Sequence, residues 1–589
     1  MAVEKLIVDH IDTWTTALQT RSTAGRGSSG KIDLYGIKKL RELILELAVR
    51  GKLVPQDPND EPASELLKRI AAEKAELVKL GKIKKPKPLP EISEEEKPFE
   101  LPVGWEWTRL NELAPMGIID GDWIESKDQD PSGTYRLIQL ADVGVGDFKD
   151  KSDRYINTST FHRLNCHQLI EGDILIARLP NPIGRACIFP KLSQSAITVV
   201  DIATMRPSGN YSAEYIISAI NSLTFRQQVE SFGKGATRFR IATGHLKTLL
   251  LPIPPVQEQY AIFKKIKELM SLCDQLEQHS LTSLDAHQQL VETLLTTLTD
   301  SQNADELAEN WARISEHFDT LFTTEASIDA LKQTILQLAV MGKLVPQDPN
   351  DEPTSKLLKR IAQEKAQLVK DGKIKKQKPF PPISDEEKPF ELPEGWEWCR
   401  ISDISTVGTG ATPSRDEPKY WLDGEINWVT SGETSKPFIE TTSECVTKKA
   451  INDTNVSIYP PGTLIIAMYG QGKTRGQITE LLIDAGTNQA CAAIQLIANE
   501  DSHRKFIKIF FEKSYDDLRA LASGGAQPNL NVAKISQTVI PLPPEREQAR
   551  VVLAVNSLLH LYSSLKKHVQ SAQQTQLHLA DALTDAAIN

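Results

Sequence analysis

The sequence predicts an α+β protein in which two globular domains of mixed helix and strand are separated by long coiled-coil helices. Three observations predict this fold. Residues 40–109 and 331–400 match at a constant offset of 291 without a gap. Each match leads into a segment of short, strand-like apolar runs, and each segment ends in a heptad pattern. A repeat this long indicates duplicated domains rather than the units of a solenoid.

The repeated stretch begins with a predicted helix. Apolar residues at 3-4-3 spacing place four side chains on one stripe in each copy, and a glycine follows as a stop. The stripe and its stop are Ile37, Leu40, Ile44, Leu47 and Gly51 in the first copy, and Ile328, Leu331, Ile335, Leu338 and Gly342 in the second. A second helix opens after Pro62 and ends at Gly81.

A lysine-rich tract follows the second helix in both copies. It reads Lys82-Ile83-Lys84-Lys85-Pro86-Lys87-Pro88, and then Lys373-Ile374-Lys375-Lys376-Gln377-Lys378-Pro379. Proline disfavours helical conformation in the residue before it, and the positive charges of neighbouring lysines repel one another. We expect each tract to be an extended, exposed strap.

The two variable segments are expected to share a fold. Each follows a Gly-Trp-Glu-Trp motif (104–107 and 395–398). Glycine and arginine residues recur at equivalent positions along both segments, such as Gly172 with Gly462 and Arg185 with Arg475. Predicted strands are 135–140, 173–177 and 196–205 in the first segment and 426–430, 463–468 and 490–497 in the second. Predicted helices are 213–221 and 506–513. The Trp-Glu-Trp motifs are interpreted as packing anchors between frame and variable segment, with base stacking as the alternative.

Each variable segment leaves through a proline-rich motif that starts a long helix. Residues 251–259 match residues 540–548 at an offset of 289, and Glu258 and Glu547 fall in the first turn, where the helix dipole favours a negative charge. Apolar residues then recur at strict 4-3 spacing, which predicts a coiled-coil seam. The seam is Ile262, Ile266, Leu269, Cys273, Leu276, Ser280, Ser283, His287, Leu290 and Leu294, then Val551, Val555, Leu558, Tyr562, Leu565, Val569, Ala572, Gln576, Leu579 and Leu583. The polar middle of the first seam predicts a break or a register-setting stretch.

These elements divide the chain of 589 residues. His10, Asp12 and Thr13 match His317, Asp319 and Thr320, so the repeat also includes the N-terminus, apart from a Gly/Ser-rich insertion near 20–30 that reads as a linker. The predicted divisions are an N-terminal helix and linker (1–36), a first helical repeat (37–100), a first variable domain (101–255), central coiled-coil helices (256–327), a second helical repeat (328–391), a second variable domain (392–544) and a C-terminal helix (545–589).

Composition limits the function classes. The net charge is −10, which argues mildly against nucleic acid, but residues 109–250 hold 16 Lys and Arg against 15 Asp and Glu, and residues 400–540 hold 14 against 16. The variable segments are therefore near neutral, and either can carry one basic face. Six scattered cysteines without a Cys-x-x-Cys pair argue against structural zinc and disulfides and fit the cytoplasm. We expect no metal site, no membrane span and no signal peptide.

Catalytic motifs are not found in the sequence. Gly470-Gln471-Gly472-Lys473-Thr474 resembles the end of a phosphate-binding loop, but Ala467 stands where that pattern needs a glycine. The Asn/Asp-Pro-Pro-Tyr/Phe loop of an adenine methyltransferase is absent, as are the His-x-Glu, His-Glu-x-x-His and Gly-x-Ser-x-Gly patterns. We interpret the loop after Ala467 as a glycine turn that lets polar side chains approach a ligand.

Polar loops in the variable segments are the remaining candidates. Residues 233–240 place three cations beside an aromatic residue, and residues 524–531 place three amides at the equivalent position. Arginine pairs bidentately with guanine, and glutamine or asparagine with adenine, so different side chains in one slot suit two base readouts. The alternatives are solvated turns, or phosphate clamps in the case of Arg178, Arg185 and Arg415. The predicted DNA-binding residues are Arg178, Arg185, Lys234, Thr237, Arg238, Arg240, Arg415, Gln471, Lys473, Arg475, Gln527, Asn529 and Asn531.

Taken together, these motifs resemble a known family over essentially the whole chain. Each variable domain begins after Leu-Pro-x-Gly-Trp-Glu-Trp and ends at Leu/Ile-Pro-x-Pro-Pro-x-x-Glu-Gln, and repeated helices join the two domains. This arrangement is similar to the specificity subunit of type I restriction–modification systems. The long Gly-Lys-Leu-Val-Pro-Gln-Asp-Pro-Asn-Asp-Glu-Pro repeat resembles the type IB, EcoAI-like branch.

The resemblance implies a DNA-binding protein that performs no reaction itself. Each variable segment would be a target recognition domain that reads one half of a split double-stranded DNA site. The helices would be antiparallel, related by a pseudo-twofold axis, and would set the spacing. Implied partners are two methyltransferase subunits, which use S-adenosylmethionine, and two ATP- and Mg²⁺-dependent restriction subunits, so that this chain binds no cofactor. The rival hypotheses are a coiled-coil scaffold for two protein ligands and an enzyme with a nucleotide site near Gly470.

Overall fold

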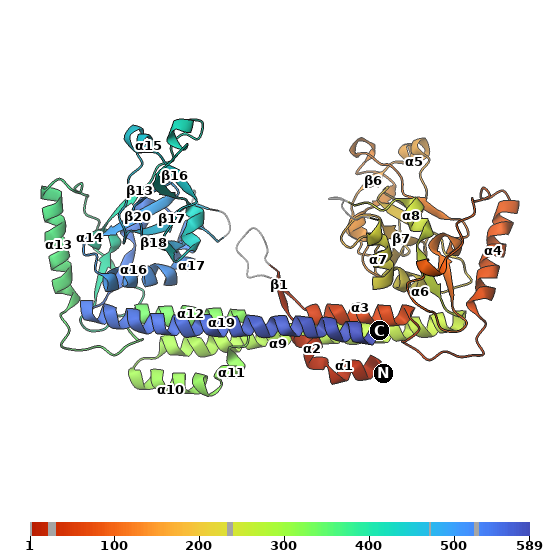
Figure 1. The fold of residues 1–589 in the computed structure, drawn as a ribbon, viewed down its shortest axis with the longest axis horizontal. Helices are drawn as coiled ribbons and strands as arrows, with labels where there is room; N and C mark the ends of the chain where they lie inside the picture. The colour runs from red at the N-terminus through yellow and green to blue at the C-terminus, as the bar shows by residue number, and fades with distance from the viewer. Residues whose placement is uncertain (1–2, 22–30, 233–238, 471–472, 524–528, 589) are drawn as a thin grey trace. The chain divides into compact units, whose positions relative to one another are not determined.

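The computed structural model describes residues 3–21, 31–232, 239–470, 473–523 and 529–588. The chain forms two compact units (Figure 1). Unit 1 holds the described residues of Met1–Gln19, Asp33–Leu281 and Gln573–Asn589, and unit 2 those of Thr20–Ile32 and Thr282–Ala572. Each unit therefore contains one variable domain, and each is described by itself.

Unit 1 builds its variable domain from two sheets. The first is antiparallel with the order β4 (Ile118–Asp120), β10 (Ile202–Met205), β7 (Ile174–Ala177) and β8 (Ala186–Ile188). The second has the order β6 (Tyr155–Ile156), β5 (Tyr135–Ile138) and β9 (Ala196–Thr198), with β5 and β9 parallel. The helices around them are α5 (Thr158–Leu164), α6 (Ala213–Ile220), α7 (Leu223–Ser231) and α8 (Thr243–Thr248).

Unit 2 repeats this topology and adds one strand, β15 (Phe438–Ile439), which pairs parallel with the fourth strand of the first sheet. Its first sheet has the order β13 (Ser405–Thr409), β20 (Cys491–Leu496), β17 (Leu464–Ala467), β18 (Ile478–Leu481) and β15 (Phe438–Ile439). Its second has the order β16 (Glu444–Val446), β14 (Ile426–Val429) and β19 (Ala485–Thr487), again with one parallel pair. The helices are α14 (Ile401–Ile404), α15 (Lys448–Asp453), α16 (Asp501–Lys513), α17 (Tyr515–Ser523) and α18 (Val532–Gln537). The expectation that both segments share one fold is confirmed.

One predicted strand is wrong in the first domain. The apolar run 196–205 forms two strands, β9 and β10, that belong to different sheets. The chain turns between them, where the Ile202 amide donates to the Val199 carbonyl at 3.0 Å. In the second domain the equivalent stretch is likewise divided between β19 and β20. Apolar periodicity alone does not reveal the turn, because both strands are buried on both faces.

A helical frame surrounds each domain. In unit 1 it comprises α1 (Val3–Asp9), α2 (Ile11–Thr16), α3 (Tyr35–Val49), α4 (Ala63–Lys79) and the first part of α9 (Val256–Asp300). In unit 2 it comprises α10 (Ala304–Glu316), α11 (Phe318–Leu321), α12 (Glu325–Val340), α13 (Thr354–Lys370) and the first part of α19 (Glu545–Ile588). The strands β1 (Gln19–Arg21) and β2 (Lys31–Asp33) pair on either side of the predicted linker, whose residues 22–30 lie outside the described part.

The predicted stripes of α3 and α12 face the core. All eight side chains of the two stripes are buried, and Gly51 and Gly342 adopt positive φ angles of 65° and 71°. A side chain at either glycine would also strike the ring of Pro102 or Pro393. These glycines are therefore required both as helix stops and for close packing against the entry to the domain.

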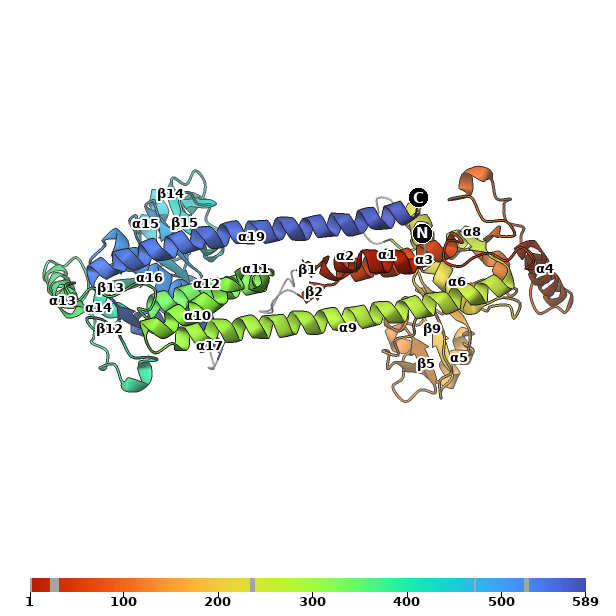
Figure 2. The same cartoon turned by 90° about the horizontal axis from the view of Figure 1, so that it is seen from below.

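Each unit places its frame helix between antiparallel portions of two long helices. In unit 1, Arg41 of α3 binds Asp274 of α9 at 2.7 Å, and Lys39 binds Asp581 of α19 at 3.0 Å. Figure 2 shows α3 between these two helices. In unit 2, α12 packs on Val291 and Leu295 of α9, and its Asp329 binds Lys566 of α19 at 2.7 Å. The predicted long antiparallel helices are confirmed, as a three-helix arrangement.

The predicted seam is wrong in the second part of both long helices. Ser283 and Leu290 are exposed, as are Ala572 and Leu579. The buried positions instead move by one residue, to Val291, Leu295 and Leu298 in α9 and to Ala580, Thr584 and Ile588 in α19. A step of four residues in place of three, a stutter, causes this shift. It falls where each helix passes from one unit into the other and so changes its packing partners.

A buried carboxylate joins three repeated motifs at the base of each domain. Glu258 accepts hydrogen bonds from the indole N–H of Trp105 at 2.9 Å and from the Gln56 amide at 3.2 Å. Glu547 accepts from Trp396 at 3.1 Å and from Gln347 at 3.2 Å. Burial raises the pKa of both carboxyl groups. Trp105 and Trp396 are only 5% exposed, which supports the interpretation of these residues as packing anchors.

A buried arginine closes the ribbon through which the chain enters and leaves each domain. The ribbons are β3 (Glu106–Arg109) with β11 (Leu250–Ile253), and β12 (Glu397–Arg400) with β21 (Val539–Leu542). Arg109 donates to the carbonyls of Pro90 and Thr248, each at 2.8 Å, and binds Glu96. Arg400 donates to the carbonyls of Pro381 and Gln537 and binds Glu387 at 2.9 Å. The ribbon is thus identical in construction in both copies.

The lysine of each Gly-Lys-Leu-Val-Pro motif holds the end of a long helix. Lys52 Nζ donates to the carbonyl of Ile588 at the end of α19, at 2.6 Å. Lys343 Nζ donates to the carbonyls of Thr299 and Ser301 at the end of α9, at 2.6 and 2.9 Å. The last carbonyls of a helix have no partner inside the helix, and the dipole there favours a cation.

Candidate nucleic-acid interface

In each domain, polar residues lie together at one end of the first sheet, where its strands end or begin. Neighbouring strands of an antiparallel sheet run in opposite directions, so β4 and β7 end where β10 begins. In the first domain this end of the sheet carries Asp120, the last residue of β4, with Arg178 after β7, Asp201 before β10 and Arg240 before α8. We call the polar side chains at this end of the sheet the sheet-end site of each domain.

The sheet-end site of the first domain is a network of paired charges. Arg178 binds Asp120 and donates to the carbonyls of Ile241 at 2.9 Å and Val200 at 3.1 Å. Arg240 binds Asp201 at 3.3 Å and also donates to the Val200 carbonyl, at 2.6 Å. Burial lowers the pKa of Arg178, which is 7% exposed. The Asp120 side chain is half exposed and the Arg240 side chain is 33% exposed, so a carboxylate and a second guanidinium group are accessible beside the buried Arg178.

The sheet-end site of the second domain holds neutral groups. Strand register makes Thr409 equivalent to Asp120 and Met468 equivalent to Arg178. Thr409 Oγ1 donates to the Cys491 carbonyl at 2.9 Å, and Thr412 Oγ1 binds the Gln489 amide oxygen. Tyr469 is 37% exposed beside them. The same end of the sheet thus carries charged groups in one domain, and amide and hydroxyl groups in the other.

The pairing of the 233–240 and 524–531 loops needs a correction of two residues. Helices α8 and α18 begin at Thr243 and Val532, an offset of 289, so Arg240 is equivalent to Asn529. Asn529 is exposed, and its carbonyl accepts from Lys534 Nζ at 3.3 Å. Asn531 caps α18, because its side chain accepts from the Lys534 amide at 2.8 Å. The Asn531 side chain therefore has a structural role at a helix start.

Two predicted arginines hold the first domain together. Arg185 is 8% exposed and donates to the carbonyls of Val143, Pro182 and Leu140 at 2.6, 2.9 and 2.8 Å. Burial lowers its pKa, as it does for Arg178. A guanidinium group whose donors already bind backbone carbonyls has few left for phosphate or base. We therefore assign Arg178 and Arg185 to the stability of the domain rather than to DNA contact.

Other predicted residues lie on the surface of the second domain. The Arg415 guanidinium lies 3.8 Å from the centroid of the Trp421 ring and binds Glu444 at 2.6 Å, with 54% of its side chain exposed. Lys473 is exposed, and its carbonyl accepts from the Tyr515 hydroxyl at 2.6 Å. Arg475 is half-buried, and its carbonyl accepts from Arg519 at 3.2 Å. Lys234, Thr237, Arg238, Gln471 and Gln527 lie outside the described residues.

Comparison with known proteins assigns the family. The family model described as the type I restriction modification DNA specificity domain matches residues 102–286 and 393–572. The specificity subunit of the type I restriction enzyme EcoAI from Escherichia coli is 52% identical over 609 aligned residues, covering 100% of both chains. The chain belongs to the type I restriction–modification specificity subunits. The EcoEI specificity subunit, also from Escherichia coli, is 49% identical over the full length of both chains.

The solved structures give weaker matches to this specificity subunit. A structure described as the basis of complex assembly and conformational transition of the type I R-M system has a TM-score of 0.47 and 16% identity, covering 84% of this chain and 99% of the other. The HsdS subunit from Thermoanaerobacter tengcongensis has a TM-score of 0.38 and 15% identity, covering 84% and 98%. The family assignment rests on the sequence relatives.

The hypothesis of a nucleotide site near Gly470 is not supported by the fold of this specificity subunit. A phosphate-binding loop joins a strand to the N-terminus of a helix, whose free amides hold the phosphate. After this loop, residues 473–477 lead into strand β18, which pairs antiparallel with β17. The described residues around the loop therefore form a strand–loop–strand connection, which offers no helix dipole to a phosphate.

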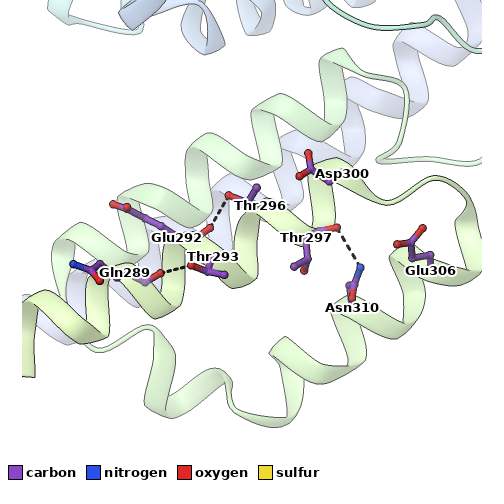
Figure 3. Close-up of a pocket in the computed structure, with 8 residues that line it drawn as sticks. All are labelled: Gln289, Glu292, Thr293, Thr296, Thr297, Asp300, Glu306 and Asn310. Carbon is purple, nitrogen blue, oxygen red and sulfur yellow. Dashed lines mark hydrogen bonds between the residues drawn. The ribbon is translucent and has the colours of Figure 1, made fainter.

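The cavities among the described residues of unit 2 of the specificity subunit include a polar one and an apolar one. The polar cavity, of about 690 Å³, lies between α9 and α10. Asn310 of α10 lines it and donates a hydrogen bond to the Thr297 carbonyl of α9 at 3.2 Å (Figure 3). Its acidic lining residues are Glu292, Asp300 and Glu306. An apolar one of about 720 Å³ lies among α9, α10, α12 and α19. Among the described residues, no three His, Cys, Asp or Glu side chains lie close enough together to hold a metal ion. No described helix is long and apolar enough to cross a membrane.

Several polar residues of the sheet-end sites were not predicted from sequence. Asp120, Asp201 and Thr243 in the first domain and Thr412 and Gln489 in the second belong to this group. Their common signal is a polar side chain directly before or after a short apolar run. That signal becomes specific only when the strand order is known, because many polar residues flank strands.

Proposed function

We propose that this specificity subunit reads a bipartite double-stranded DNA site, with one variable domain for each half. The observation that carries the proposal is the contrast between the two sheet-end sites. One fold, set on one repeated frame, presents Asp120, Asp201 and Arg240 at this end of the sheet in the first domain. The second domain has Thr409, Ala490 and Asn529 at the matching positions, with Gln489 next to Ala490. Base edges in the major groove differ in their donor and acceptor patterns, so unlike side chains at one position select unlike bases.

The proposed DNA contacts comprise side chains that read bases, side chains that contact phosphates, and further predicted contacts in the adjoining loops. Arg240 and the exposed carboxylate of Asp120 can recognise guanine and cytosine, while Gln489 and Asn529 suit adenine. Lys473, Arg475 and Arg415 lie on the surface of the second domain and suit phosphate contacts. Lys234, Thr237, Arg238, Gln471 and Gln527 remain predicted contacts in the adjoining loops.

We further propose that the frame sets the distance between the half-sites and docks the partner subunits. Both units repeat the same junction, ribbon and lysine contact, so they offer two equivalent docking places to one kind of partner. The partners are two methyltransferase subunits, which supply S-adenosylmethionine, and two restriction subunits, which supply ATP and Mg²⁺ chemistry. This chain catalyses no reaction and acts in the cytoplasm.

The proposal is tested by methylome sequencing of a host that expresses this chain with its methyltransferase. The expected result is adenine methylation within one asymmetric motif of two defined halves separated by an unread spacer. Duplex binding by the purified complex is then measured across a range of salt concentrations. A complex that binds every duplex equally well would favour the protein scaffold, and ATP-dependent behaviour of the isolated chain would favour the enzyme.

The role of the frame as a spacer gives a second prediction. A seven-residue insertion in α9 between residues 256 and 281 keeps the heptad register and adds about 10 Å at 1.5 Å per residue. We expect the unread spacer of the methylated motif to lengthen by about three base pairs at ~3.4 Å each. The control is a substitution of seven exposed residues in the same stretch without change of length. A motif with an unchanged spacer would refute the spacing role.

A further inference from the structure

Two lysine straps, residues 82–88 and 373–379, have no role in the contacts described so far. Each strap leaves its helix through a glycine with positive φ, Gly81 at 67° and Gly372 at 72°. The amides of Lys82 and Lys373 then donate to the carbonyls of Leu77 and Leu368, both at 3.0 Å. The predicted exposure is confirmed, since all residues of both straps except Ile83 and Ile374 are exposed, and residues 84–88 and 375–379 belong to no helix, strand or turn.

The far end of each strap is fastened to the entry ribbon. Arg109 donates to the carbonyls of Pro90 and Glu91, and Arg400 donates to that of Pro381. Each strap is therefore held at both ends, and its lysines are presented between two fixed points. Figure 1 shows α4 and α13 beside the variable domains of their units, which places each strap next to a domain that reads DNA under the proposed function.

The straps concentrate positive charge that the described structure does not neutralise. No acidic residue occurs in 80–90 or 372–384. Among the ion pairs of the described residues, none includes a strap lysine. The eight lysines are Lys82, Lys84, Lys85 and Lys87, and Lys373, Lys375, Lys376 and Lys378. In a protein of net charge −10, two such unopposed clusters are local exceptions.

The choice of lysine indicates the class of ligand. Lysine is depleted in protein–protein interfaces, where arginine and aromatic residues are enriched. Its ammonium group is a point charge that contacts phosphate without the fixed geometry of a guanidinium fork. An extended chain rises about 3 Å per residue, so lysines two residues apart lie about 6 Å apart, which allows neighbouring phosphates of a strand to be contacted. The straps also belong to the repeated frame, so their ligand is common to both halves.

We propose that the two lysine straps bind the phosphate backbone of duplex DNA independently of its sequence. The proposal rests on the proposed function, because it adds an affinity that both half-sites share. The near-neutral variable domains then choose the bases, while the straps supply part of the electrostatic attraction. A lysine that neutralises a phosphate releases counterions from the DNA. Each lost contact therefore makes the negative slope of log affinity against log salt concentration less steep by about 0.9.

The test uses the complex of this chain with its methyltransferase and two duplexes of equal length, one with the methylated motif and one scrambled. One variant carries K82Q/K84Q/K85Q/K87Q, a second carries K373Q/K375Q/K376Q/K378Q, and a third combines them. Matched controls replace the same lysines with arginine and so keep the charge. We expect each glutamine variant to bind both duplexes about tenfold more weakly at moderate salt, with a shallower salt slope. The ratio between the two duplexes and the behaviour of the arginine controls stay unchanged.

The other outcomes overturn the proposal in distinguishable ways. An unchanged salt slope together with loss of methyltransferase assembly would identify an acidic protein surface as the ligand. An unchanged slope with intact assembly would identify the straps as solvated surface. If the complex without substitutions binds neither duplex, the proposed function itself fails. The single-strap variants keep the test informative if the combined variant does not fold.

Discussion

Exchange of residues 110–250 for the corresponding segment of another family member is expected to change one half of the methylated motif and leave the other half intact. The cut points fall at the inner ends of the β3–β11 ribbon. Trp105, Arg109 and Glu258 therefore stay with the frame, and the junction that they form is preserved. Methylome sequencing of the host reads the outcome directly. A change in both halves, or in neither, would contradict the assignment of one half to one domain.

Several buried contacts cross the cut, and the contact between Glu46 and Thr224 decides how the exchange must be made. Glu46 of α3 is 1% exposed and accepts from the Thr224 amide at 3.0 Å and from its hydroxyl at 2.5 Å. A donor segment without a hydroxyl at this position would leave a buried carboxylate with fewer partners, at a cost of about 1–3 kcal/mol. The matched control is therefore a pair of chimaeras that differ only in whether threonine is kept at position 224. Both should read the same motif, and the one with threonine should be the more stable.

Substitution of Arg400 by alanine is expected to destabilise unit 2 by about 3 kcal/mol, because a buried charged donor is lost. The side chain is 7% exposed, and its removal leaves the carbonyls of Pro381 and Gln537 without their charged donor. Loss of hydrogen bonds from a charged group costs about 1.5–3 kcal/mol, and the emptied volume adds to this. The unfolding midpoint of the full chain in urea and the hydrogen-exchange protection of β12 and β21 measure the effect.

The same substitution has a pH signature. The hydrogen bond from Arg400 lowers the pKa of Glu387 to about 2. A carboxyl group with a lowered pKa stabilises the fold above its ordinary pKa and loses that contribution as pH falls toward the folded value. The difference in stability between the unsubstituted protein and the Arg400→Ala variant should therefore narrow between about pH 4.5 and pH 2. A constant difference over this range would show that Glu387 does not share in the effect.

Arg415 provides the matched control for Arg400. It belongs to the same domain and also binds a carboxylate, but more than half of its side chain is exposed. Exposed ion pairs and cation–π contacts each contribute about 1 kcal/mol or less. Arg415→Ala should therefore change stability by about 1 kcal/mol or less and lower the affinity for duplex DNA. The replacement of Arg400 by lysine keeps the charge but not the fork, so its stability should lie between those of the other variants.

Features that depend on local sequence were predicted best. The stripes of α3 and α12, the stops at Gly51 and Gly342 and the exposed lysine straps follow from periodicity, glycine conformation and charge. The seam failed beyond Ser280 and Val569, because the packing partners change there and heptad counting assumes one partner throughout. The run 196–205 failed because two sheets share it.

The candidate site was predicted only in outline. The loops with unlike polar residues remain a prediction, and Arg178 and Arg185 bind carbonyl groups from distant parts of their own domain. A sequence shows that an arginine is present and does not show how many acceptors the fold brings to it. Asp120 and Asp201 were missed for the same reason, since their importance depends on which strands are neighbours.

The lysine contacts at the ends of α9 and α19 bear on how such a protein changes over time. Lys52 and Lys343 both donate to main-chain oxygens, which every amino acid supplies. The side chains at the two helix ends differ, as Thr299 and Ser301 do from Ile588, while the same main-chain clasp is retained. The clasp therefore places no demand on the side chains at these ends, whereas it requires a long cationic side chain at both lysine positions.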